Sequence, residues 1–124
     1  ADIPIGGEPG PEVITGSTRL KSGTAQKMVL NMLSTGAMIR LGKVYGNLMV
    51  DVKPTNEKLV RRAISIVSTA ANVSEDESRQ ALEQCGFSAK TAIVMLTKGL
   101  PAQEAERRLA ENGGIVARAL DEED

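Results

Sequence analysis

The sequence contains almost no aromatic residues, and this limits the kind of core that the chain can build. Tyr45 and Phe87 are the only aromatic residues among 124. Aromatic side chains are typical of β-strands, whereas a core of Leu, Ile, Val, Met and Ala suits helix packing. Charged residues make up 25% of the chain and hydrophobic residues 41%, which is globular composition. We therefore expect a mainly helical, folded protein.

Charge and residue usage argue against several classes of function. Fifteen basic and sixteen acidic residues give a net charge of -1, whereas gripping a nucleic acid duplex requires clustered cations. The chain has no histidine, which argues against zinc sites and histidine-activated nucleophiles. No apolar run approaches the roughly 20 residues that span a bilayer. We expect no nucleic acid, membrane or metal partner, and the single cysteine without a leader-like segment favours a cytoplasmic location.

The first third of the sequence predicts one extended segment and one long helix. Residues 1–5 are β-like, and a sheet that completes their hydrogen bonds must come from elsewhere, which suggests a fragment. Glycines and prolines in residues 6–11 exclude regular structure. Apolar residues at three- and four-residue steps then predict a helix over about 18–41, apolar on more than one side in its second half. Gly23 and Gly36 disfavour a helix, so a close backbone approach is expected at each.

The remaining sequence predicts a connector and a bundle of short helices. Residues 43–53 alternate weakly and are expected to be extended; in them Asn47 and Asp51 need polar partners, either in the loop backbone or in a ligand at a dimer interface. Capping residues then predict four short helices. The first is capped by Thr55 or Asn56 and ends at Asn72, and the second begins with a capping box from Ser74 to Glu77 and ends at Cys85-Gly86. The third is capped by Ser88 and ends at Gly99, and the fourth has Pro101 at its first helical position and is broken at Gly113-Gly114.

The segment 10–27 carries the residues best suited to chemistry. It feeds a helix N-terminus, where free backbone N–H groups and the helix dipole favour an anion. Ser17 and Thr18 can donate hydrogen bonds there, and Arg19 or Lys21 can supply positive charge. An ordinary capped helix start with solvated cations explains the same residues, so residue types alone leave a phosphate site and a plain helix start both open.

Longer stretches of the sequence resemble a known family. They run over residues 10–27, 28–35, 47–52, 55–59 and 90–96, and the likeness extends to Ala119. They resemble the N-acetylmuramic acid 6-phosphate etherases and their relatives, the glucokinase regulatory proteins. The resemblance implies that residues 1–53 are the last strand and helix of an SIS-type α/β sugar-phosphate domain, that 54–120 form a helical C-terminal bundle, and that 121–124 are a solvated, disordered acidic tail. Residues 73–96 also resemble the ubiquitin-associated (UBA-like) three-helix fold.

The resemblance also implies a reaction. Such etherases cleave the lactyl ether of N-acetylmuramic acid 6-phosphate by elimination and water addition, giving N-acetylglucosamine 6-phosphate and D-lactate without a cofactor. The family's principal acid and base glutamates are expected upstream, so we expect the chain to be inactive alone. Glu12 is the remaining candidate for a catalytic carboxylate, unless it only pairs with Arg19 or Lys21. The candidate substrate-binding residues are Ser17, Thr18, Arg19, Lys21 and Thr24.

These features lead to two hypotheses about the function of the chain. In the first, the chain is the C-terminal part of an etherase, contributing one wall of an amino-sugar phosphate site. In the second, it is a non-catalytic regulatory module that senses sugar phosphates or binds proteins. In either case the apolar helix is expected to be covered in a homodimer or swapped oligomer, because exposed apolar surface is costly.

Overall fold

The computed structural model describes residues 2–121, which divide into two compact units. The first unit comprises residues up to 38 and the second begins at residue 39. Helices account for most of the described residues, as the aliphatic composition predicted. The only strands among residues 2–121 form one short hairpin.

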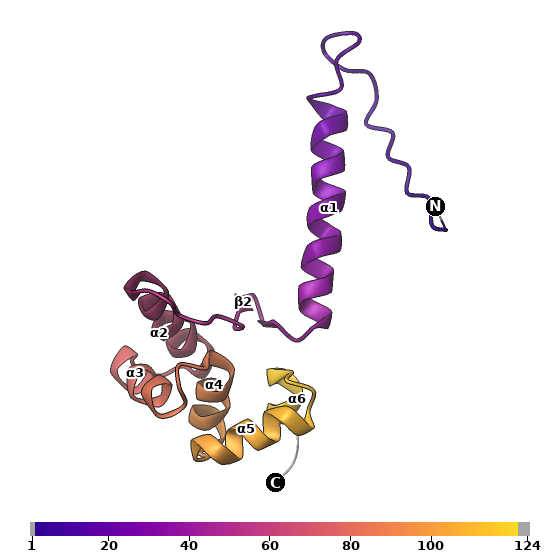
Figure 1. Ribbon diagram of the computed structural model, residues 1–124. Coiled ribbons are helices and arrows are strands. Elements are labelled where there is room, and N and C mark those ends of the chain that lie inside the picture. The colour runs from indigo at the N-terminus through magenta and orange to yellow at the C-terminus, as the bar shows by residue number, and fades with distance from the viewer. Residues whose placement is uncertain (1, 122–124) are drawn as a thin grey trace. The chain divides into compact units, whose positions relative to one another are not determined.

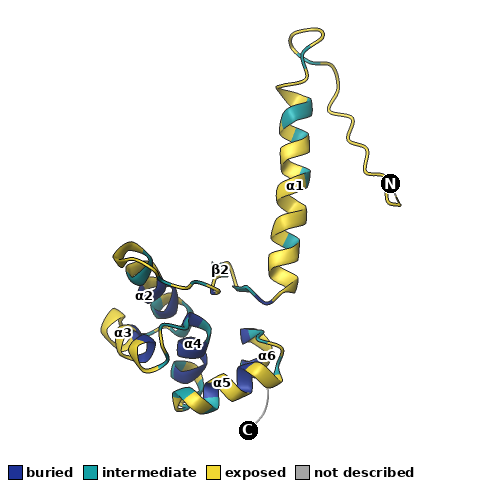
Figure 2. Ribbon diagram, in the orientation of Figure 1, coloured by how far each residue is buried: buried dark blue, intermediate teal, exposed yellow. Residues whose placement is uncertain are grey.

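The first unit consists of an extended segment, a loop and one long helix. Residues 2–5 form no strand, because a strand requires a partner and none of residues 2–38 supplies one. Helix α1 (Lys21–Arg40) matches the predicted long helix, and none of its residues is buried. Figure 2 shows it without a dark blue residue along its length. Its exposed apolar side chains are Met28, Leu30, Met32, Leu33, Met38 and Ile39.

An extended connector opens the second unit. Strands β1 (Val44–Tyr45) and β2 (Leu48–Met49) pair antiparallel, with Val44 opposite Met49 and Tyr45 opposite Leu48. Gly46 turns the hairpin with a φ of 57°. Val50 follows β2 and is almost completely buried, so the connector is anchored in the same core as the helices.

The predicted caps set the boundaries of the next helices. Helix α2 (Glu57–Ala71) begins at the side-chain cap of Asn56 and ends at Asn72, which adopts the left-handed conformation. Helix α3 (Glu75–Gln84) begins with the predicted capping box of Ser74 and Glu77. Helix α4 (Ala89–Lys98) is capped by Ser88 and ends at left-handed Gly99. Because each signal acts within one helical turn, the sequence was sufficient to predict them.

The C-terminal end differs from the sequence prediction in three places. Pro101 is the N-cap of α5 (Ala102–Glu111) rather than its first helical residue. A helix ends before Gly113 and Gly114 as predicted, but a further helix, α6 (Val116–Asp121), follows them, and its Val116 and Ala119 are buried in the core. Asp121, assigned to the acidic tail, is the last residue of α6, while residues 122–124 lie outside the described residues.

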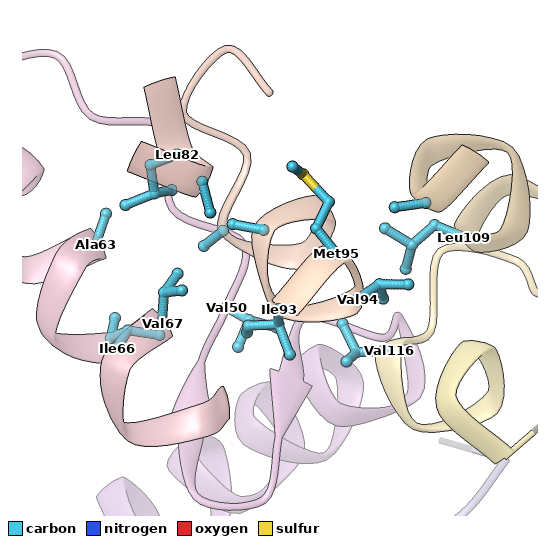
Figure 3. Packing of buried hydrophobic residues seen from close by; sticks show 14 of the residues in the cluster. Val50, Ala63, Ile66, Val67, Leu82, Ile93, Val94, Met95, Leu109 and Val116 are labelled. Carbon is cyan, nitrogen blue, oxygen red and sulfur yellow. The ribbon is translucent and has the colours of Figure 1, made fainter. Parts of the chain in front are cut away.

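The core of the second unit is built around α4. In Figure 1, α2 and α3 lie on one side of this helix and α5 and α6 on the other. Figure 3 shows Ile93 and Val94 of α4 between Val67 of α2 and the side chains of Leu109 and Val116. The connector before residue 54 packs against the helices that follow it. The predicted domain boundary between residues 53 and 54 stays a prediction.

The buried core predicts a large effect of truncating Leu82. This side chain is completely buried, so Leu82→Ala should lower the free energy of unfolding by about 2–5 kcal/mol through lost burial and a cavity. Leu41→Ala is the matched control, because Leu41 is 63% exposed, and it should change stability by less than about 0.5 kcal/mol. Urea unfolding followed by circular dichroism measures both; equal effects of the two substitutions would contradict this core.

Candidate functional site

The carboxylate of Glu12 lies at the N-terminus of α1. The backbone N–H of Lys21 donates to Oε2 of Glu12 and that of Ser22 donates to Oε1, each at 3.0 Å. Glu12 therefore caps a helix that begins nine residues further along the chain. Glu12 was expected to pair with the Arg19 or Lys21 side chain, if it had a purely structural role, whereas it accepts hydrogen bonds from backbone N–H groups.

These hydrogen bonds favour the charged form of Glu12. The N–H of Lys21, followed by that of Ser22, lowers the pKa of the Glu12 carboxyl below its usual value. Since the folded pKa is lowered, the cap stabilises the closed loop at pH values above the unfolded pKa. That stabilisation is lost as the pH falls through the lowered pKa.

The first four N–H groups of α1 all have acceptors within the chain. Those of Lys21 and Ser22 bind Glu12, that of Gly23 donates to the carbonyl oxygen of Thr18 at 3.0 Å, and that of Thr24 donates to Leu20 at 3.1 Å. The sequence predicted free N–H groups at this position, and that prediction is wrong, because all four have acceptors. An external anion at α1 would therefore depend on side chains or would have to displace Glu12.

Gly23 brings the backbone of the loop against α1. A Cβ built on Gly23 would lie 3.2 Å from the carbonyl oxygen of Thr18, so the close approach predicted at Gly23 is confirmed. A Cβ on Gly36 would meet no described atom within 4 Å. The close approach predicted at Gly36 is therefore absent among the described residues.

Two grooves flank the first turns of α1 within the first unit. One, of about 490 Å³, lies between residues 5–9 and the helix, and both Thr18 and Ser22 line it. The other, of about 470 Å³, is lined by Lys21 and Thr24 together with apolar residues. The predicted substrate-binding residues are thus distributed between two faces of the helix, and neither groove is lined by Ser17 or Arg19.

The groove next to Thr18 also contains polar residues that the sequence analysis did not select. Ser22 and Gln26 both line it. Their four-residue spacing places them on one face of α1, one turn apart. The sequence shows this four-residue spacing, but the spacing points to Ser22 and Gln26 only once the structure has shown that one of them lines the groove.

The second unit has a groove of its own beside the connector. It measures about 430 Å³ and is lined by residues 50–54 and 86–90. Asp51 forms an ion pair with Lys43 at 2.9 Å, and the hydrogen bond from Lys43 lowers the pKa of the Asp51 carboxyl. Among the described residues, the partner of Asp51 is therefore the side chain of Lys43 rather than the loop backbone, which was one of the two partners expected for it. Asn47 is exposed in the hairpin turn.

Metal ligation, a reactive cysteine and a membrane-spanning helix are three further features that the described residues allow us to examine. No cluster of three possible metal-ligating side chains occurs within residues 2–121. Burial raises the pKa of the half-buried Cys85 thiol, which donates to the carbonyl oxygens of Leu82 and Ser88. A thiol with a raised pKa is a poor nucleophile at neutral pH. None of the helices in the described part is long and apolar enough to cross a membrane.

Comparison with known proteins connects the chain to an enzyme family. Over 121 residues it is 59% identical to the N-acetylmuramic acid 6-phosphate etherase of Cutibacterium acnes, which covers 98% of the chain. The identity is 58% over 120 residues to that of Klebsiella aerogenes, covering 97% of the chain, and 56% over 123 residues to that of Aliivibrio fischeri, covering 99%. The chain is homologous to these etherases.

The homology covers a defined share of the relatives. The chain spans about 40% of the length of the Cutibacterium and Klebsiella etherases, and 41% of the Aliivibrio one. Residues 46–91 also match a family model described as the C-terminal lid domain of glucokinase regulatory protein. The matched residues run from the β1–β2 turn into α4. The chain thus matches both groups of proteins that its sequence resembled, the etherases and the glucokinase regulatory proteins.

The environment of Gly23 predicts different results for two glycine substitutions in α1. Gly36→Ala should raise the helix content of α1, since alanine is favoured over glycine in a helix by about 1 kcal/mol. Gly23→Ala gains the same propensity but places its Cβ 3.2 Å from the Thr18 carbonyl oxygen, so it should displace the loop. Backbone amide NMR measures this: residues 17–19 should shift with Gly23→Ala and stay in place with Gly36→Ala. Unmoved signals in both variants would contradict the close approach.

Proposed function

We propose that the chain forms part of an N-acetylmuramic acid 6-phosphate etherase that cleaves the lactyl ether to N-acetylglucosamine 6-phosphate and D-lactate. The observation that carries the proposal is an identity of 56–59% to the three etherases described above over nearly the whole chain. Identity at this level across 97–99% of the chain includes the candidate site as well as the core. The substrate is then an amino-sugar phosphate, and the proposed location is the cytoplasm.

The proposed role of the first unit is to provide one wall of the sugar-phosphate site. Thr18 and Ser22 contribute hydroxyl groups to the larger groove, and Arg19 and Lys21 are exposed cations beside the start of α1. Hydroxyl and cationic side chains suit a phosphate in a site whose helix amides already have acceptors. Lys21 and Thr24 line the other groove, and the proposal assigns Ser17 and Glu12 to the same site from the loop before α1.

The proposed architecture follows the resemblance. In it, α1 is the last helix of an SIS-type sugar-phosphate domain whose remaining elements cover the apolar side chains of α1. Residues 73–96, for which the sequence suggested a UBA-like fold, comprise α3 and most of α4, with the turn at Gly86 and Phe87 between the two helices. Both turn residues have a positive φ, which supports a tight helix-to-helix turn there.

The match of residues 46–91 to a lid domain of a regulatory protein favours a second candidate function. In this alternative, the chain is a non-catalytic module that senses sugar phosphates or binds another protein. The matched part belongs to the second unit, whereas the candidate residues of segment 12–24 belong to the first. A protein partner retained after replacement of Arg19 would support this alternative.

Titration with N-acetylglucosamine 6-phosphate tests the proposed site. Backbone amide NMR should show shifts confined to residues 12–27, and unphosphorylated N-acetylglucosamine should give weaker ones. Thr18→Ala should weaken binding about tenfold or more, since a hydrogen bond to a charged group contributes about 1.5–3 kcal/mol. Thr15→Ala is the matched control, because Thr15 is an exposed threonine of the same loop that lines neither groove. Shifts absent at millimolar ligand, or spread over the second unit, would contradict this site.

The exposed apolar side chains of α1 predict an oligomer. Leu30, Met32 and Leu33 are each about 60% exposed, and burying them removes apolar surface from water at about 25 cal/mol per Å². The isolated chain should therefore form a homodimer or swapped oligomer through α1. Light scattering coupled to size exclusion measures the mass, and Leu33→Glu should shift the population toward monomer. A monodisperse wild-type monomer would contradict the proposal.

A further inference from the structure

We propose that Glu12 is a positioning residue of the sugar-phosphate site rather than a group that transfers a proton. In this proposal, its carboxylate holds the N–H groups of Lys21 and Ser22 and thereby fixes the loop of residues 13–20 at the start of α1. The proposal rests on the proposed function, because the loop carries Ser17, Thr18 and Arg19. The resemblance implied a catalytic role for Glu12, and the geometry points to this different one.

The two hydrogen bonds use both oxygens of the carboxylate. Oε2 and Oε1 each accept one backbone N–H at 3.0 Å, from consecutive residues of the first helical turn. This bidentate geometry is charge-assisted and is favoured by the positive end of the helix dipole. An elimination needs a base with a pKa near the working pH, and the two N–H groups instead lower the pKa of Glu12.

The loop between Glu12 and α1 has few other anchors. Val13 is 81% exposed and Ile14 is 65% exposed, so burial does not hold the loop in place. Within it, the described backbone bond joins the Ser17 N–H to the Ile14 carbonyl oxygen at 3.1 Å, and Thr18 accepts from Gly23. The Glu12 carboxylate closes the loop across nine residues. Removing it leaves the loop attached to the helix mainly through Thr18.

Amide hydrogen exchange of the ligand-free chain tests the positioning role. Glu12→Gln keeps the side-chain shape but removes the charge and one acceptor, so exchange at Lys21, Ser22 and the loop should accelerate by about tenfold. Glu8→Gln is the matched control, since Glu8 is an exposed carboxylate outside this cap. Unchanged amide positions in the second unit verify folding. Unchanged exchange at residues 17–22 in Glu12→Gln would overturn the proposal.

A pH titration of the wild-type chain tests the same contact without a substitution. The amide protons of Lys21 and Ser22 should shift together, with a midpoint below the ordinary glutamate pKa of about 4.3. Lys21 and Ser22 signals that do not follow the Glu12 carboxyl would overturn the proposal even if Glu12→Gln fails to fold.

Kinetics of a full-length etherase that carries this sequence separate positioning from proton transfer. Glu12→Gln should raise KM for the sugar phosphate several-fold and leave kcat within about threefold. Loss of a proton-transferring group lowers the rate by about 10²–10⁴, so a fall of that size in kcat at unchanged KM would overturn the proposal. If the full-length protein has no etherase activity, the proposed function fails, whereas the exchange and titration experiments still decide whether Glu12 positions the loop.

Discussion

The second unit depends on the packing of a single helix, α4. Its Ala89, Ala92, Ile93 and Val94 are completely or almost completely buried, so it contributes side chains to the core in several directions. The alanines allow neighbouring helices to approach closely, and the β-branched residues fill the space between them. Because α2, α3, α5 and α6 all pack on it, loss of α4 would separate two helix pairs that have no common core without it.

The first unit is stabilised by different interactions. Helix α1 buries no residue, and its N-terminal loop is closed by hydrogen bonds from backbone N–H groups to Glu12 and Thr18. Solvent competes for such bonds, so they stabilise the chain far less than a buried aliphatic core does. The proposed architecture therefore assigns the covering of the apolar side chains of α1 to surfaces outside the first unit.

The sequence predicted the local features and missed those that depend on distant residues. Asn56, Ser74 and Ser88 were identified as caps because a cap and its N–H partners lie within three residues. Helix α6 was missed because Gly113 and Gly114 are strong local breakers, whereas Val116 and Ala119 are held by contacts with distant α4. The Glu12 cap was missed for the same reason, since no local pattern joins a carboxylate to amides nine and ten residues away. For the candidate site, the sequence located the segment but not the distribution of its side chains over two grooves.

In the proposal made for Glu12, one carboxylate links the stability of the loop to binding of the sugar phosphate. A helix N-terminus is a good anion site because its N–H groups lack partners, and a carboxylate of the same chain competes for them at an effectively high concentration. An external phosphate is then recognised by whatever side chains the closed loop presents. Serine, threonine and arginine side chains of a loop have a fixed orientation only if the loop backbone is fixed. In the proposal, Glu12 occupies the helix N–H groups that could otherwise bind the phosphate, and it also orients the loop side chains that bind the phosphate instead. On this argument, the carboxylate acts on the sugar phosphate through the loop that it holds in place.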